Sequence, residues 1–176
     1  MTIRVYNSRR VECIARAALP MSARRAWGQI RDFHRFAAHD PFHANIAIDG
    51  QVPQAGARLS IEHRYGPLRI RRVGRILKWR EGVGFAYSDL SQRGTRCGFP
   101  HVMSIAVAGS DARDTSILTV RVTGRWTLPV PRWMALMWLR WVMATIEHRT
   151  RNDLLAFLVA TQARKAATLA PSQLSD

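Results

Sequence analysis

The chain has 176 residues and a mass of 20.0 kDa, a length that suits one folded domain with its own core. A hydrophobic share of 47% and a charged share of 22% are ordinary for a globular protein and exclude a disordered or collagen-like chain. The net charge of +15 is almost wholly arginine, because Lys78 and Lys165 are the only lysines. This charge attracts phosphate, anionic lipid or acidic ligands, or it reflects GC-rich coding without any partner.

Neither the cysteines nor the apolar segments point to export or to a membrane span. Cys13 and Cys97 are too few for a disulfide framework, which favours a reducing compartment. The basic N-terminus lacks the apolar segment of a secretory signal. The longest apolar stretch, residues 133–146, contains Arg140 and is shorter than the roughly 20 residues that a spanning helix needs. We therefore expect a soluble cytoplasmic protein.

The first predicted element is a strand over residues 11–19, where the odd positions are apolar and Pro20 follows. Ser22 is a candidate N-cap for a short helical segment, as one helix or two, with apolar residues at helical spacing from Ala26 to Phe36. Between residues 44 and 126, alternating apolar positions and Gly, Pro and Asp turn signals predict six successive strands.

A long helix is predicted from about Arg132 to about Ala166, because this stretch follows Pro129 and Pro131 and contains neither Gly nor Pro. One strand, short helices, a run of antiparallel strands and a final helix make an α+β arrangement.

This order of elements resembles the START-like (SRPBCC) superfamily, which includes Bet v 1, polyketide cyclases and aromatases, and lipid-transfer domains. The resemblance covers residues 11 to about 158. It implies a helix-grip fold, in which a curved antiparallel sheet wraps around the long C-terminal helix and two short helices follow the first strand. It also implies a cavity for an apolar molecule within a single domain, residues 1–166, with residues 167–176 as a flexible tail. The segments that carry it are 26–33, 36–42, 56–58 and 126–158.

Strand alternation places several polar side chains on faces that are otherwise apolar. His63 and Tyr65 share the face of Leu59 and Ile61, and Tyr87 shares that of Phe85. We predict His63, Tyr65, Phe85 and Tyr87 as cavity residues that orient a ligand. The alternative is that these polar groups are satisfied by partners in the core.

The long helix supplies a second group of predicted cavity residues. At about 100° per residue, Arg140, Glu147 and Arg151 fall on one stripe, with His148 at its edge. The resemblance implies a cavity wall on this helix, where an arginine would fix an acidic or phenolic ligand group while Glu147 and Arg151 pair. The alternative is a solvated stripe.

No metal or cofactor is expected. His34, His39 and His43 are spaced five and four apart, but Pro41 interrupts any helix between them. The HExxH, GxSxG, P-loop and GxGxxG motifs are all absent.

Two surfaces are candidate contact sites. Outward arginines on the strands form a basic face that is either solvated or binds phosphate or an anionic membrane; nucleic acid is not the expected partner, because no recognised motif accompanies it. The arginines of this face are Arg69, Arg71, Arg75, Arg121 and Arg125.

The start of the long helix is surrounded by apolar side chains, among them Trp133, Met137, Trp138 and Trp141. A helix that is apolar on all sides is buried on all sides, which predicts a homodimer, a membrane contact, the ligand's entrance or cover by loops of the same chain.

The leading hypothesis is a protein that binds a hydrophobic or aromatic small molecule, lipid or polyketide-like, between sheet and helix. One alternative is a polyketide cyclase or aromatase type of enzyme that uses the same cavity. The second is a surface module that contacts membrane or nucleic acid through the basic face. The sequence leaves open whether any catalysis occurs.

Overall fold

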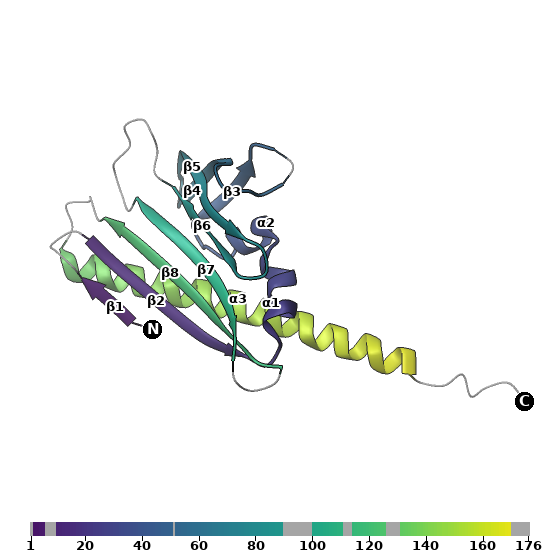
Figure 1. The fold of residues 1–176 in the computed structure, drawn as a ribbon. Coiled ribbons are helices and arrows are strands. Elements are labelled where there is room, and N and C mark those ends of the chain that lie inside the picture. Colours follow the sequence, from purple (N-terminus) through teal and green to yellow (C-terminus); the bar gives the residue numbers. More distant parts are fainter. Residues whose placement is uncertain are drawn as a thin grey trace, which may run out of the picture.

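One antiparallel sheet and one long helix dominate the computed structural model, which describes residues 2–5, 10–50, 52–89, 100–110, 114–125 and 131–169. The sheet has eight strands in the order β1-β2-β8-β7-β6-β5-β4-β3 and is curved (Figure 1). The strands are β1 (Thr2–Val5), β2 (Arg10–Leu19), β3 (His43–Ile48), β4 (Arg58–Tyr65), β5 (Leu68–Arg80), β6 (Gly84–Ser88), β7 (His101–Gly109) and β8 (Ser116–Arg125).

The two short helices that the resemblance implied lie between β2 and β3. α1 (Ala23–Ile30) begins after Ser22, as expected, although the Ser22 side chain makes no capping hydrogen bond. α2 (Phe33–Ala37) is capped by Asp32, whose carboxylate accepts a hydrogen bond from Arg35 N at 3.1 Å. Both helices bury an apolar face, to which Trp27 and Phe36 belong.

The long helix α3 (Arg132–Leu169) packs along β2 on the inner side of the sheet (Figure 1). Its C-terminal part projects beyond the sheet. No helix among the described residues is long and apolar enough to cross a membrane. The face that α3 buries is an apolar stripe with one threonine: Ala135, Leu139, Val142, Met143, Ile146, Thr150 and Leu154.

Inward faces of the strands follow the predicted alternation. Leu59 and Ile61 of β4 are fully buried, and so is Val120 of β8. Val83 has the same parity as Phe85 and Tyr87, which predicts an inward side chain, but it is 47% exposed because it lies in the turn before β6 and not in the strand. The sheet and the helices thus enclose one continuous core.

The structure adds one strand and extends one helix relative to the sequence analysis. β1 was not predicted; it pairs with β2, with Ile3 opposite Cys13. α3 continues to Leu169, past the expected end at Ala166, so the helix includes the start of the segment expected as a tail. The rest of that segment, residues 170–176, lies outside the described residues, as does Trp126.

Candidate functional site

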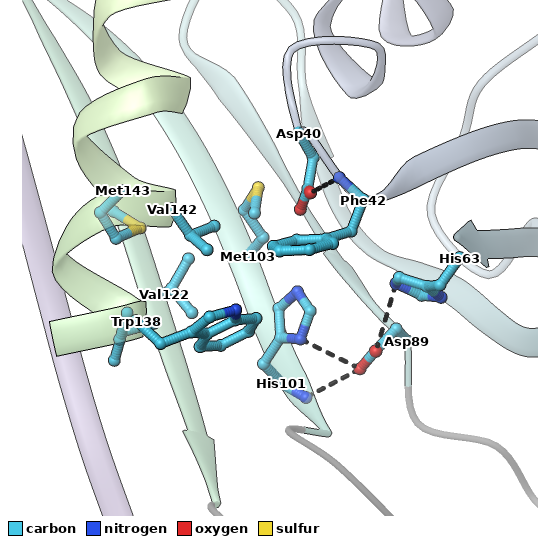
Figure 2. Close-up of a pocket in the computed structure, with 11 residues that line it drawn as sticks. Asp40, Phe42, His63, Asp89, His101, Met103, Val122, Trp138, Val142 and Met143 are labelled. Atoms are coloured by element: carbon cyan, nitrogen blue, oxygen red, sulfur yellow. Dashed lines mark hydrogen bonds and ion pairs between the residues drawn. The ribbon is translucent and has the colours of Figure 1, made fainter. Parts of the chain in front are cut away.

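A pocket lies between the inner face of β7 and β8 and the N-terminal half of α3 (Figure 2). It is narrow, because the volume open to the centres of water molecules is about 20 Å³, which holds one or two waters. The polar end of the pocket is lined by Asp40, His63, Asp89 and His101, and Phe42 lies beside them. The apolar wall is Met103, Val122, Trp138, Leu139, Val142 and Met143.

Asp89 is the centre of the polar end, and its side chain is fully buried. Arg72 Nη1 donates to Asp89 Oδ2 at 2.5 Å, and the backbone N–H of His101 donates to Oδ1 at 2.7 Å. Burial disfavours the charge on Asp89, but the positive charges of His101 and Arg72 and the hydrogen bond from His101 N outweigh it, so the pKa of Asp89 is lowered. The pocket therefore contains a fixed negative charge.

A close approach of two strands places Asp89 beside Arg72. A Cβ at Gly74 of β5 would collide with the carbonyl of Ser88, the residue that ends β6. Glycine at this position lets the end of β6 come near β5, and Asp89 follows directly. The backbone therefore requires glycine here.

The His101 ring lies between Asp89 and the pocket interior. Its Nδ1 is 3.4 Å from Asp89 Oδ1, and its other nitrogen points toward Phe42 and Met103 (Figure 2). The sheet holds this orientation, because His101 begins β7 opposite Gly124 of β8.

His63 approaches the same carboxylate from β4. Its Nε2 is 3.9 Å from Asp89 Oδ2, and its ring stacks edge-on against His43 with centroids 4.9 Å apart. Burial, followed by the charge of His43, lowers the pKa of His63 to about 3. His63 is therefore a neutral hydrogen-bonding group at physiological pH.

Of the strand residues predicted to line a cavity, one lines this pocket and two lie in the core. His63 lines the pocket. Tyr87 is buried beside it, where its hydroxyl donates to Met103 Sδ at 3.2 Å, and Phe85 stacks on Trp79 with centroids 5.3 Å apart. Neither Phe85 nor Tyr87 is among the residues that line the pocket. The side chain of Tyr65 lies outside the described residues.

The predicted charged stripe of α3 does not form a wall of this pocket. Arg140, His148 and Arg151 are exposed, and Glu147 is half-buried. The sheet covers the neighbouring apolar stripe that contains Val142 and Ile146, because burying that face removes apolar surface from water while the arginines keep their hydration. None of the four residues of the stripe lines this pocket, and their contact with a ligand stays a prediction.

Sequence reasoning missed Arg72, Asp89 and His101. The alternation of the strands could have indicated two of them. Arg72 is separated by even numbers of residues from the inward Gly74 and Ile76, and His101 is related in the same way to the buried Met103 and Ile105. A buried arginine needs a buried acid as a partner. The partner itself could not be read from the sequence, because Asp89 follows a strand end.

The three histidines considered for a metal lie in different surroundings. His34 is exposed, His39 Nδ1 lies 2.9 Å from Thr150 Oγ1, and His43 Nδ1 donates to the Ala37 carbonyl at 2.9 Å. Among the residues that the structure describes, no group of three or more His, Cys, Asp or Glu side chains is arranged to hold a metal ion.

The basic face of the sheet is exposed, as predicted, but acidic residues neutralise part of it. Arg69 and Arg71 lie 2.9 and 3.5 Å from carboxylate oxygens of Glu62. Arg121 pairs with Glu12, whose side chain is almost completely buried.

The tryptophan-rich start of α3 is exposed beside the pocket. Trp133, Met137 and Trp141 are 63%, 61% and 53% exposed. Trp138 is half-buried and packs on Phe42 with ring centroids 5.5 Å apart. Both Trp138 and Phe42 line the pocket, so this apolar patch is continuous with the pocket's wall.

Comparison with solved structures identifies the fold. The START superfamily protein from Mycobacterium smegmatis superimposes with a TM-score of 0.64 at 13% identity, covering 83% of this chain and 98% of that one. TTHA0849 from Thermus thermophilus gives 0.60 at 12%, covering 82% and 97%. Ara h 8.0201 gives 0.60 at 12%, covering 84% and 99%. No family model and no curated protein matches the sequence. The α+β helix-grip fold that the resemblance implied is thus confirmed.

Proposed function

We propose, from its START-like helix-grip fold, that the protein binds a hydrophobic or aromatic small molecule between the sheet and α3. The observation that carries the proposal is the pocket itself, whose wall is apolar and whose polar groups gather at one end. Ligand sites commonly combine an apolar lining with a few placed polar groups. We place this activity in the cytoplasm, because two cysteines are too few for the disulfide framework of an exported domain.

The pocket must widen to admit such a ligand, and its wall contains side chains suited to that movement. Met103 and Met143 are unbranched and adopt several shapes at little energetic expense. Trp138 is half-buried at the edge of the pocket, beside solvent. We expect these three side chains to move when a ligand enters.

Titration with N-phenyl-1-naphthylamine, a neutral probe that fluoresces in apolar surroundings, tests the proposal. We expect saturable binding to the wild type and at least about tenfold weaker binding to Val142→Phe, whose phenyl ring fills the pocket. Ala144→Phe, on the exposed side of α3, is the matched control and should bind as the wild type does. Absence of saturable binding to the wild type would overturn the proposal.

The exposed patch of Trp133, Met137 and Trp141 is, in this proposal, the surface through which the ligand exchanges with an anionic membrane. Tryptophan suits the membrane interface, and exposed Arg132 and Arg140 on the same helix suit anionic headgroups. A second copy of the chain is the less favoured occupant, because two molecules of charge +15 repel each other.

Flotation with vesicles tests this contact. We expect the protein to float with phosphatidylglycerol vesicles, less so at high salt, and not with phosphatidylcholine vesicles. The double variant Trp133→Ser/Trp141→Ser should lose flotation, whereas Val159→Ser, which removes an equally exposed apolar residue farther along α3, should keep it. A dimer in light scattering that the double variant abolishes, without flotation, would replace the membrane proposal.

A further inference from the structure

We propose that the pocket takes a compact cyclic hydrophobic molecule and not an extended acyl chain, because a block of packed aromatic rings closes its inner end. The inference rests on the proposed function, since it names the class of ligand that the same pocket admits. Two observations carry it: the pocket ends at one level on three elements, and the rings beyond that level are fixed by one another. The rings of this aromatic block are Phe33, Phe36, Phe85 and Tyr87.

The apolar wall of the pocket ends at the same level on β7, β8 and α3. Met103, Val122 and Met143 line the pocket on these three elements. The next inward residue on each element does not line it and is at most 1% exposed. Beyond this level, side chains therefore fill the space between sheet and helix. These deeper residues are Ile105, Val120 and Ile146.

Strand β6 places two rings of the aromatic block beside this inner end. In the pairing of β6 with β7, Tyr87 lies opposite Met103, and Phe85 lies opposite Ile105. The Tyr87 hydroxyl donates to Met103 Sδ at 3.2 Å, so the tyrosine contacts a side chain that lines the pocket. Tyr87 is therefore the first ring that a ligand would meet if Met103 moved aside.

The rings of the aromatic block hold one another in place. Phe33 of α2 makes edge contacts with Phe85 and Tyr87, at centroid distances of 5.4 and 5.2 Å. Phe36 of the same helix contacts Phe85 at 5.4 Å, and Phe85 also stacks on Trp79 at 5.3 Å. One ring could be displaced only if its neighbours moved too, because a close-packed interior has few voids.

The outer part of the pocket is adaptable, in contrast to this fixed inner end. Met103 and Met143 are unbranched, and Trp138 is half-buried at the edge beside solvent. These side chains let the pocket become wider, whereas the aromatic block keeps it from becoming deeper. A compact ring system uses the width. The far end of an acyl chain would stay outside and gain nothing from burial.

Displacement of N-phenyl-1-naphthylamine by neutral 1-alkanols, from butanol to dodecanol, measures the depth of the pocket. Each methylene group that enters should raise the affinity about fourfold. We expect this rise to stop before dodecanol in the wild type, because the end of the chain has then reached the aromatic block. A rise that continues through dodecanol would overturn the inference.

Tyr87→Ala tests the residue that sets the depth. The variant removes the ring behind Met103, so the rise should continue to a longer alkanol than in the wild type. Dodecanol should bind about tenfold more tightly to the variant than to the wild type, the gain from burying about two more methylene groups.

Trp27→Leu is the matched control. Trp27 is also a buried ring and joins the same set of aromatic contacts through Trp79, but its place in that set is remote from Tyr87. The control should keep the wild-type limit on alkanol length. An equal shift in both variants would reflect a general loosening of the core and would overturn the role of Tyr87.

The outcomes separate this inference from the proposed function. If Tyr87→Ala does not fold, the wild-type alkanol series decides. Saturable binding of N-phenyl-1-naphthylamine, together with an affinity that rises through dodecanol, would overturn the closed inner end and leave the proposed function standing. Absence of saturable binding of the naphthylamine probe would overturn both.

Discussion

Arg35 holds Asp153 with two nitrogens, Nε at 2.5 Å and Nη2 at 2.6 Å from the two carboxylate oxygens, and so joins α2 to α3. This bidentate pair keeps the short helix against the middle of the long one. The side-chain hydrogen bond from Arg35 is the main cause of the lowered pKa of Asp153.

Arg35→Leu is therefore expected to lower the free energy of unfolding, although modestly. Arg35 and Asp153 are 44% and 30% exposed, so solvent screens the pair and the loss should be about 0.5–1 kcal/mol. Urea unfolding measures it. The control is Arg31→Leu, which removes a looser ion pair. Arg31 Nη1 lies 3.5 Å from Glu81 Oε1, and both side chains are about twice as exposed as Asp153, so the loss of stability should be smaller. An equal loss would contradict the role of the bidentate geometry.

Stability should fall as the solution is acidified below about pH 6.5, because of His63. Its folded-state pKa of about 3 lies below the ordinary value of 6.5, so the unfolded chain takes up a proton in this range and the folded protein does not. Between about pH 7 and pH 5 the difference corresponds to about 2 kcal/mol. His43, Arg72, Asp89 and His101 surround the ring and contribute to the shift.

Urea unfolding at the two pH values, for His63→Leu and for the exposed-site control His34→Leu, assigns this pH dependence. The control should keep the wild-type fall in stability, and His63→Leu should lose most of it. A variant that falls as steeply as the wild type would show that another group is responsible.

Gly74→Ala should destabilise the protein and disturb the Asp89 site. The added methyl group meets the Ser88 carbonyl, which is backbone and cannot move aside without shifting β6. We expect a loss of about 1–3 kcal/mol in thermal unfolding. Gly28→Ala in α1 is the control; its Cβ meets nothing within 4 Å and should raise stability by about 0.5–1 kcal/mol. Equal stability of the two variants would contradict the close approach.

Cys13 should resist thiol reagents in the folded protein. It is completely buried on β2, and burial raises the pKa of its thiol to about 11, so little thiolate forms near neutral pH. In a Cys97→Ser background, reaction with a disulfide reagent should follow global unfolding. Rapid labelling of the native protein would show that β2 opens locally.

Arg151→Leu should cost about 0–1 kcal/mol of stability and leave probe binding unchanged, because Arg151 is exposed on α3. Urea unfolding and titration with N-phenyl-1-naphthylamine check both expectations. Weaker binding of the probe to Arg151→Leu would show that the charged stripe of α3 takes part in ligand binding.

The sequence by itself determined the succession of elements and the inward faces of the strands. Alternation over residues 11–19 and 116–125 and the long stretch without Gly or Pro are local patterns, and local periodicity is what a single sequence records directly. The same patterns placed His63 on a buried face.

Tertiary structure alone decided which polar groups meet and which side of α3 is buried. Arg72, Asp89 and His101 lie on different strands or at their ends, so only the pairing of β5 with β6 and of β6 with β7 brings them together. α3 has two adjacent stripes that contain apolar residues, one with Val142 and Ile146 and one with Arg140 and Arg151. The stripe without charged residues packs against the sheet. Contacts between residues distant in the sequence, and the differences in burial energy that select among them, depend on the packed arrangement and not on local spacing.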